Sequence, residues 1–204
     1  MDTFTAIETR RSVKYFDPQH RMTEAEIQHL IALAMLSPTA FNLQHWRFVT
    51  VHDPALRQQI RTAAHDQEQV TDASLLLVLC ADLKAWRRYP ERCWSNAPQQ
   101  VRDYMLPTID QFYRYHEQAQ HDECLRSCGI AAQTVMLTAR AMGYDSCPMV
   151  GFDFDAVAKL INLPDDHLIS MFIVIGRALK AAQPRPGQLA MDEVLLVDGF
   201  PVAP

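Results

Sequence analysis

The spacing of apolar residues predicts that helices and strands mix along this chain. Over residues 24–35, apolar residues recur every three or four positions, the period of a helix with one buried face. Thr23 and Glu26 stand where each side chain can bond the other's backbone N–H, and Pro38 follows the end of the helix. Residues 75–80 are apolar at every position, which is typical of a strand covered on both faces.

Weaker versions of the same patterns predict the remaining elements. We expect further helices over 3–10, from Pro54, over about 124–142 and over 153–162, strands over 46–51 and 170–176, and a short segment over 146–151. Gly143 stands where a helix ends in a left-handed cap. This mixture indicates an α/β or α+β class, and the element order alone favours a parallel sheet.

Two stretches do not follow this succession of helices and strands. Residues 84–122 combine aromatic and charged residues with three prolines, and because aromatic rings need cover, we expect a helical excursion rather than a linker. Residues 181–204 are dotted with prolines and contain the apolar run 194–197, which is typical of a strand that pairs with a sheet edge. The expected organisation is one domain over 1–204, with an excursion at 84–122 and a C-terminal extension at 181–204.

Composition limits the classes of function. With 204 residues, of which 49% are hydrophobic, the chain can bury a substantial core. Its net charge of −5 argues against nucleic-acid and membrane-surface partners, which need a basic face. The five cysteines are an odd number and indicate reduced thiols in the cytoplasm. Neither a signal peptide nor a membrane span is expected, since the first residues lack an apolar segment and the longest apolar run is 75–81.

Several kinds of chemistry lack their sequence motif. No GxGxxG follows a strand, and there is no Walker loop, CxxC, HExxH or GxSxG. Cys124 and Cys128 are four apart on an alanine-rich helix, the spacing of core packing, and Cys147 reads as a structural thiol. We therefore expect no metal site.

A cluster of cations near the start needs an explanation on an acidic chain. Arg10, Arg11, Ser12 and Lys14 fall within five residues. Most charge runs are solvated faces. Arginines beside a hydroxyl are also the groups that hold a phosphate, through bidentate, charge-assisted bonds and a neutral donor.

Four motifs together resemble the FMN-dependent nitroreductase family. RRSVKYFD resembles the family's phosphate-binding opening, and SPTAFNLQHWRFV resembles its S-P-x-x-x-N-x-Q-P-W-x-F segment. QVTDAS before LLLVLCA, and then ARAMGYDSCPMVGFD, complete the set in the same order and cover nearly the whole chain. The chain departs from the pattern at His45, where proline is usual, and at Asp66, where many relatives have asparagine. Asp66 either points away from the flavin or lowers its reduction potential.

The resemblance implies an α+β nitroreductase-like fold, with a mixed central sheet flanked by helices, built as an intertwined homodimer. The segment 38–44 would come from the partner subunit, and the amide of Val150 or Gly151 would point at flavin N5. Arg185 would add a second cation to the phosphate. The residues implied to bind FMN are Arg10, Arg11, Ser12, Lys14, Pro38, Thr39, Phe41, Asn42, Gln44, Gln69, Pro148, Met149, Val150, Gly151 and Arg185.

The implied function is NAD(P)H-dependent reduction of nitroaromatic, quinone or other electron-poor acceptors by a ping-pong mechanism. The flavin carries the chemistry, and Lys14 or Arg10 would stabilise negative charge on it, so no catalytic side chain is expected. Aromatic residues of the excursion either pack helices across the dimer or, at Phe112 or Tyr113, cover the flavin and stack on acceptors. Two alternatives stay open: a dehalogenating or flavin-fragmenting branch of the same fold, and a flavin-binding sensor or carrier without turnover.

Overall fold

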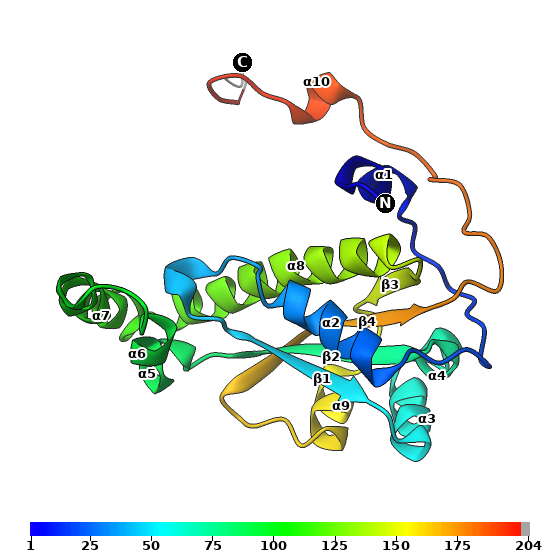
Figure 1. Cartoon of the computed structure of the whole chain (residues 1–204), viewed down its shortest axis with the longest axis horizontal. Coiled ribbons are helices and arrows are strands. Elements are labelled where there is room, and N and C mark those ends of the chain that lie inside the picture. Colours follow the sequence, from blue (N-terminus) through cyan, green and yellow to red (C-terminus); the bar gives the residue numbers. More distant parts are fainter. Residues whose placement is uncertain (201–204) are drawn as a thin grey trace.

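A computed structural model describes residues 1–200 of the chain. Four strands form one sheet in the order β1–β2–β4–β3 (Figure 1). Every ladder between neighbouring strands is antiparallel. The strands are β1 (Trp46–Val51), β2 (Leu75–Asp82), β3 (Asp145–Met149) and β4 (His167–Gly176).

The sheet differs from the expected parallel or mixed arrangement. β2 and β3 run in the same direction and are joined through helices, but β4 lies between them and pairs antiparallel with both. The order of elements could not predict this insertion, so the parallel sheet is wrong. Within residues 1–200, the parallel pairing is limited to one bridge between Ser12 and Ser146 at the β3 edge.

Helices cover both faces of the sheet. One buried cluster joins α2 (Glu24–Ala34) and α8 (Glu117–Ala141) to Leu75, Leu77 and Leu79, and a second joins α3 (Pro54–Ala63), α4 (Gln69–Asp72) and α9 (Phe154–Leu160) to Leu76 and Val78. Successive side chains of β2 therefore pack on opposite faces, as a strand geometry requires. The expected strand with two covered faces is confirmed.

The helix ends follow the predicted local chemistry. Thr23 N donates to Glu26 Oε2 at 2.7 Å and Glu26 N donates to Thr23 Oγ1 at 3.3 Å, which completes the capping box. Gly143 has φ 85°, and Tyr144 N donates to Ala139 O at the end of α8. α8 begins at Glu117, seven residues before the expected start at Cys124. Its first turns carry mostly polar residues that leave no apolar period to detect.

The helical excursion lies at one end of the sheet (Figure 1). It contains α5 (Ala85–Arg88), α6 (Pro90–Cys93) and α7 (Gln99–Tyr113), and residues 117–122, expected within it, belong to α8. Tyr113 is fully buried in a cluster with Leu43 and Trp86, so its expected role as a stacking cover is wrong. Phe112 is 45% exposed.

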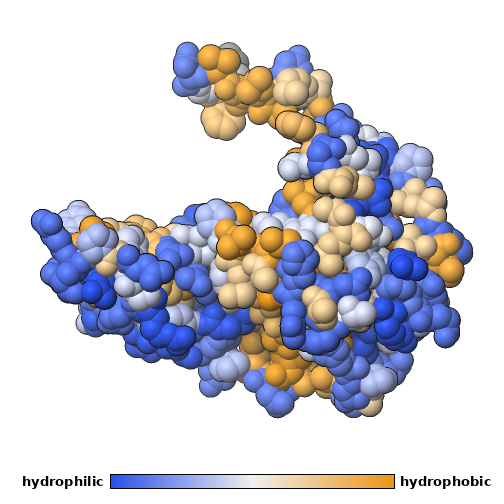
Figure 2. All heavy atoms as spheres, in the orientation of Figure 1, coloured by the Kyte–Doolittle hydropathy of each residue, from blue (hydrophilic) through white to orange (hydrophobic). Residues whose placement is uncertain are grey.

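The C-terminal extension leaves the sheet after Gly176 and passes α1 (Thr3–Thr9), and α10 (Met191–Val194) lies away from the body of the molecule (Figure 1). A hollow separates this arm, rich in apolar residues, from the body (Figure 2). Residues 194–197 are exposed and form no strand within this chain. The last four residues of the expected extension lie outside the described residues. Across residues 1–200, no helix has the length and apolar character to span a membrane.

Candidate functional site

The basic cluster lines a pocket of about 290 Å³. The pocket is formed where the segment after α1 meets the start of the C-terminal arm, so it brings residues 10–15 together with residues 180–186. Five residues expected to bind FMN share this pocket: Arg10, Arg11, Ser12, Lys14 and Arg185.

The charges in this pocket are not balanced by acids. Among residues 1–200, no carboxylate forms an ion pair with the pocket's arginines or Lys14. The Arg10 Nη1 atom is buried without a hydrogen-bond partner. Burial, followed by the neighbouring Arg185 and Arg11, lowers the pKa of Arg10. A buried donor and several like charges are costly without a ligand, and a phosphate would satisfy both. The residues present therefore fit a phosphate.

Backbone bonds fix this cluster at the start of β3. Ser12 bridges Ser146, and Val13 N donates to Ser146 O at 3.1 Å. Gly151 follows Ser146 by five residues, a length of about 16 Å in extended chain. Pro148 and Met149 lie between them, with Met149 buried. The expected phosphate end and the expected ring end of the site therefore lie along β3 and the loop that follows it.

The backbone at Val150 and Gly151 is open to a ligand. Val150 is 62% exposed. A Cβ added at Gly151 would meet only Gln67 Nε2, at an ordinary contact distance of 3.7 Å, and the residue has no positive φ. Packing within the chain does not require glycine here, and its small size leaves room for close approach from outside.

Gln69 is buried on α4 and is held by a residue that sequence reasoning missed. Gln69 Nε2 donates to Gln67 Oε1 at 2.9 Å, and Gln67 Nε2 donates to Gly151 O at 2.9 Å. The link joins α4 to the loop after β3. No local pattern marks Gln67, because its partner Gly151 is 84 residues away.

The second predicted segment, 38–44, is strained and clamped by the excursion. Phe41, Asn42 and Gln44 have φ of 52°, 54° and 50°, a region that non-glycine residues rarely adopt. Asn42 Nδ2 donates to Cys93 O and Trp94 Nε1 donates to Phe41 O, both at 2.8 Å. Strain of this kind persists where surroundings hold it, and it gathers at functional sites. Sequence reasoning missed the clamp, since its contacts are also long-range.

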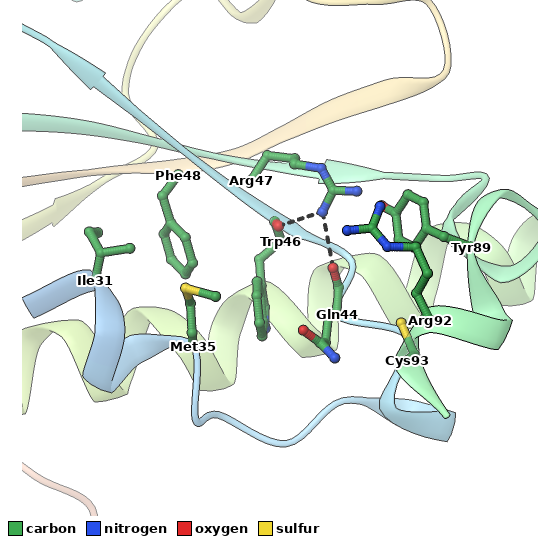
Figure 3. A pocket seen from close by; sticks show the side chains of 9 residues that line it. All are labelled: Ile31, Met35, Gln44, Trp46, Arg47, Phe48, Tyr89, Arg92 and Cys93. Carbon is green, nitrogen blue, oxygen red and sulfur yellow. Dashed lines mark hydrogen bonds between the residues drawn. The ribbon is translucent and has the colours of Figure 1, made fainter. Parts of the chain in front are cut away.

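Gln44 also lines a second pocket, of about 540 Å³, at the unpaired edge of β1 (Figure 3). The Trp46 indole lies between Met35 and Gln44, and Arg47 Nη1 donates to the carbonyls of Gln44 and Trp46 (Figure 3). Thr39 Oγ1 accepts from Gln44 N at 2.9 Å, which fixes the turn into the strand. Pro38 is exposed at the start of this segment.

The two predicted clusters are far apart within one chain. The His45 ring bonds Ser127 Oγ at 3.0 Å, and Arg140 Nε donates to Thr9 Oγ1 at 3.0 Å. Ser127 and Arg140 are thirteen positions apart on α8 (127 to 140), which is about 20 Å along the helix. The structure therefore brings the basic cluster to β3 but leaves residue 45, at the end of the 38–44 segment, about 20 Å away along α8.

The structure shows where His45 and Asp66 lie, the two residues that depart from the family motifs. His45 is 2% exposed, and burial lowers its pKa to about 4, so the ring is a neutral packing group. Asp66 is exposed in the turn after α3, with φ 54°.

Cys147 lies near Lys14, Ser12 and Arg10, but burial dominates and raises the pKa of its thiol, as is typical of a structural cysteine.

A cluster of Asp82, Asp166 and His167 has side-chain atoms within 4.8 Å of one another. The Asp82 carboxylate is engaged by Arg47 at 3.1 Å and by Arg88 at 3.4 Å, and Arg88 also pairs with Asp166. The two guanidinium cations compensate these carboxylates, so the cluster needs no metal ion for charge balance. We assign the cluster to holding α5 against β1 and β2.

Comparisons with known proteins agree with these features. A model of the nitroreductase family matches residues 7–177. DrgA of Synechocystis sp. is 48% identical over 200 residues, 96% of this chain and 95% of that protein. A Thermus thermophilus protein named NADH dehydrogenase is 30% identical over 200 residues, with 96% of each covered. A structure from Exiguobacterium sibiricum in complex with FMN matches with TM-score 0.90 at 27% identity, covering 97% of both chains, and confirms the expected fold. The chain belongs to the nitroreductase family.

Proposed function

We propose that this protein is an FMN-dependent oxidoreductase that uses NADH or NADPH to reduce nitroaromatic, quinone or other electron-poor acceptors by a ping-pong mechanism. The observation that carries the proposal is the uncompensated cation pocket fixed at the start of β3, with the open Gly151 backbone at the other end. Membership of the nitroreductase family and the FMN held by a similar structure support it.

The chain's own groups would hold and orient the cofactor. Arg10, Arg11, Ser12 and Arg185 would bind its phosphate, and Lys14 would lie toward the pyrimidine edge. The backbone after β3 would lie beside the ring system. When bound, FMN supplies the acceptance and release of electrons. We assign no side chain of this site as an acid or base.

We also propose that the working form is a homodimer in which residues 38–44 reach the partner's flavin. The distance of that segment from the basic cluster of its own chain supports this arrangement. So do exposed apolar side chains on α1, on α8 and along the arm, which a lone chain leaves in water: Phe4, Ile7, Ile130, Leu189, Met191 and 194–197. The arm would cross to the partner. All five cysteines are free, which supports a reducing, cytoplasmic location.

Steady-state kinetics with NADH or NADPH and either a quinone or a nitroaromatic tests the function. We expect turnover with both acceptor classes and parallel lines in double-reciprocal plots at different acceptor concentrations. Flavin binding without turnover would contradict the reductase and favour a sensor or carrier. Activity limited to halogenated tyrosines, or flavin breakdown in the presence of oxygen, would assign the protein to another branch of the fold.

A further inference from the structure

Three hydrogen bonds determine which way the Gln67 side chain faces. Its Nε2 donates to Ala64 O at 3.1 Å and to Gly151 O at 2.9 Å, and its Oε1 accepts from Gln69 Nε2 at 2.9 Å. Backbone carbonyl oxygens only accept hydrogen bonds. The end of the Gln67 amide that faces two carbonyls must therefore be its nitrogen.

The orientation of Gln67 sets the orientation of Gln69. Because the nitrogen of Gln67 faces the carbonyls, its oxygen is the atom turned toward Gln69, and an oxygen there requires a donor opposite. The Gln69 nitrogen supplies that donor. Within residues 1–200, the Gln69 Oε1 atom has no hydrogen-bond partner, although the residue is only 5% exposed. The oxygen itself is not among the buried unpaired atoms, so it is reachable on an otherwise buried residue and can accept from a ligand.

We infer that Gln67 is a positioning residue that makes Gln69 present a carbonyl oxygen, and so select a ligand with an N–H donor at this point. Resting on the proposed function, the donor is the imide N3–H of the flavin ring. The same Gln67 side chain bonds Gly151 O, so the acceptor and the backbone expected beside the ring are held by one group.

Among the described residues, the bond to Gln67 is the one hydrogen bond that the Gln69 side chain makes. Gln67 Nε2 donates to two separate segments, the turn after α3 and the loop after β3. A residue at 67 that cannot donate would leave the Gln69 amide free to turn its NH₂ group toward the ligand. Two donors would then face each other, which loses one hydrogen bond and leaves both groups unpaired.

The test compares binding of FMN and of 3-methyl-FMN, which lacks the imide N–H, by quenching of flavin fluorescence. We expect the unaltered protein to bind FMN about tenfold more tightly than the methylated flavin. In Gln69→Leu this ratio should fall toward one, apart from the steric effect of the methyl group. In Gln67→Met the ratio should also fall although Gln69 is still present.

Gln58→Met is the matched control, because Gln58 is exposed on α3 and its side chain bonds nothing among the described residues. It should keep the unaltered ratio. Thermal unfolding establishes that each variant is folded. If Gln67→Met weakens both flavins equally, Gln67 has only a structural role and the inference is wrong. A ratio near one in the unaltered protein also overturns it. Failure to bind FMN at all would instead contradict the proposed function.

Discussion

Arg10 is the residue on which the phosphate assignment depends most. Its Nη1 is buried without a partner, in a pocket of like charges. A charge-assisted bond to phosphate contributes about 1.5–3 kcal/mol, so Arg10→Ala should weaken FMN binding by about tenfold to over a hundredfold. Because removal of Arg10 also relieves repulsion from Arg11 and Arg185, folding should be unaffected or slightly stabilised. Titration of apoprotein with FMN and with riboflavin measures the effect.

The control for Arg10 is Arg87→Ala, an exposed arginine on α5 without an acidic partner among the described residues. It should leave FMN affinity unchanged. Riboflavin lacks the phosphate, so Arg10→Ala should hardly change its affinity. Loss of both ligands in equal measure would show that Arg10 supports the fold and not the phosphate.

The burial of the His45 ring predicts that the free energy of unfolding depends on pH. Its pKa is about 4 when folded, against an ordinary value of 6.5, because burial opposes the charge. Between these values the unfolded chain binds a proton that the folded chain does not. Stability is therefore complete above about pH 6.5 and falls as the pH drops toward about 4. The loss is on the order of 3 kcal/mol.

Urea unfolding of the protein and of His45→Asn, each from neutral pH to about pH 4, isolates this effect from that of the carboxylates. The asparagine cannot be protonated, so the free energy of unfolding of the variant should fall less steeply over the same range. Identical slopes for the two proteins would show that His45 is accessible to protons in the folded state.

At the scale of elements, the clamp between α6 and the 39–44 segment predicts a defined effect of Trp94→Phe. The substitution keeps an aromatic ring but removes the N–H that bonds Phe41 O. The loss should cost about 1 kcal/mol of unfolding free energy. Because Phe41 and Asn42 are held in strained conformations, FMN affinity should fall as well.

Trp46→Phe is a comparison, since the Trp46 Nε1 has no partner among the described residues. Removing that N–H should cost less stability than removing the bonded one of Trp94. If the Trp94→Phe protein keeps its stability and its FMN affinity, the bond from Trp94 to Phe41 does not hold this segment in place.

The local elements could be predicted from the sequence, and the long-range pairings could not. β1 and the capping box at Thr23 follow from periodicity and from side-chain spacing over a few residues. The insertion of β4 between β2 and β3 depends on packing that no local pattern encodes. The same holds for the candidate site. The contiguous basic motif could be predicted from the sequence, whereas Gln67 and Trp94 act through partners 84 and 53 residues away.

At the scale of the whole molecule, truncation after Gly187 tests the crossing arm. The shortened chain keeps Arg185 in the phosphate pocket but loses α10 and the exposed run 194–197. We expect a weaker dimer and lower FMN occupancy together, because in the proposed dimer residues 38–44 would reach the flavin only from an attached partner. Sedimentation and flavin content, measured on one preparation across dilution, follow both. A dimer that stays fully loaded would contradict the crossing arm, and a monomer that holds FMN tightly would contradict the shared site.

The most direct test of the central claim is the visible absorption of the FMN-loaded protein under anaerobic conditions. On addition of NADH or NADPH alone, the flavin band should bleach, and it should return when a quinone is added after the nucleotide has been consumed. Bleaching followed by recovery requires both bound FMN and separate half-reactions with donor and acceptor. A protein that binds no flavin, or whose flavin band stays unchanged with both nucleotides, would contradict the account.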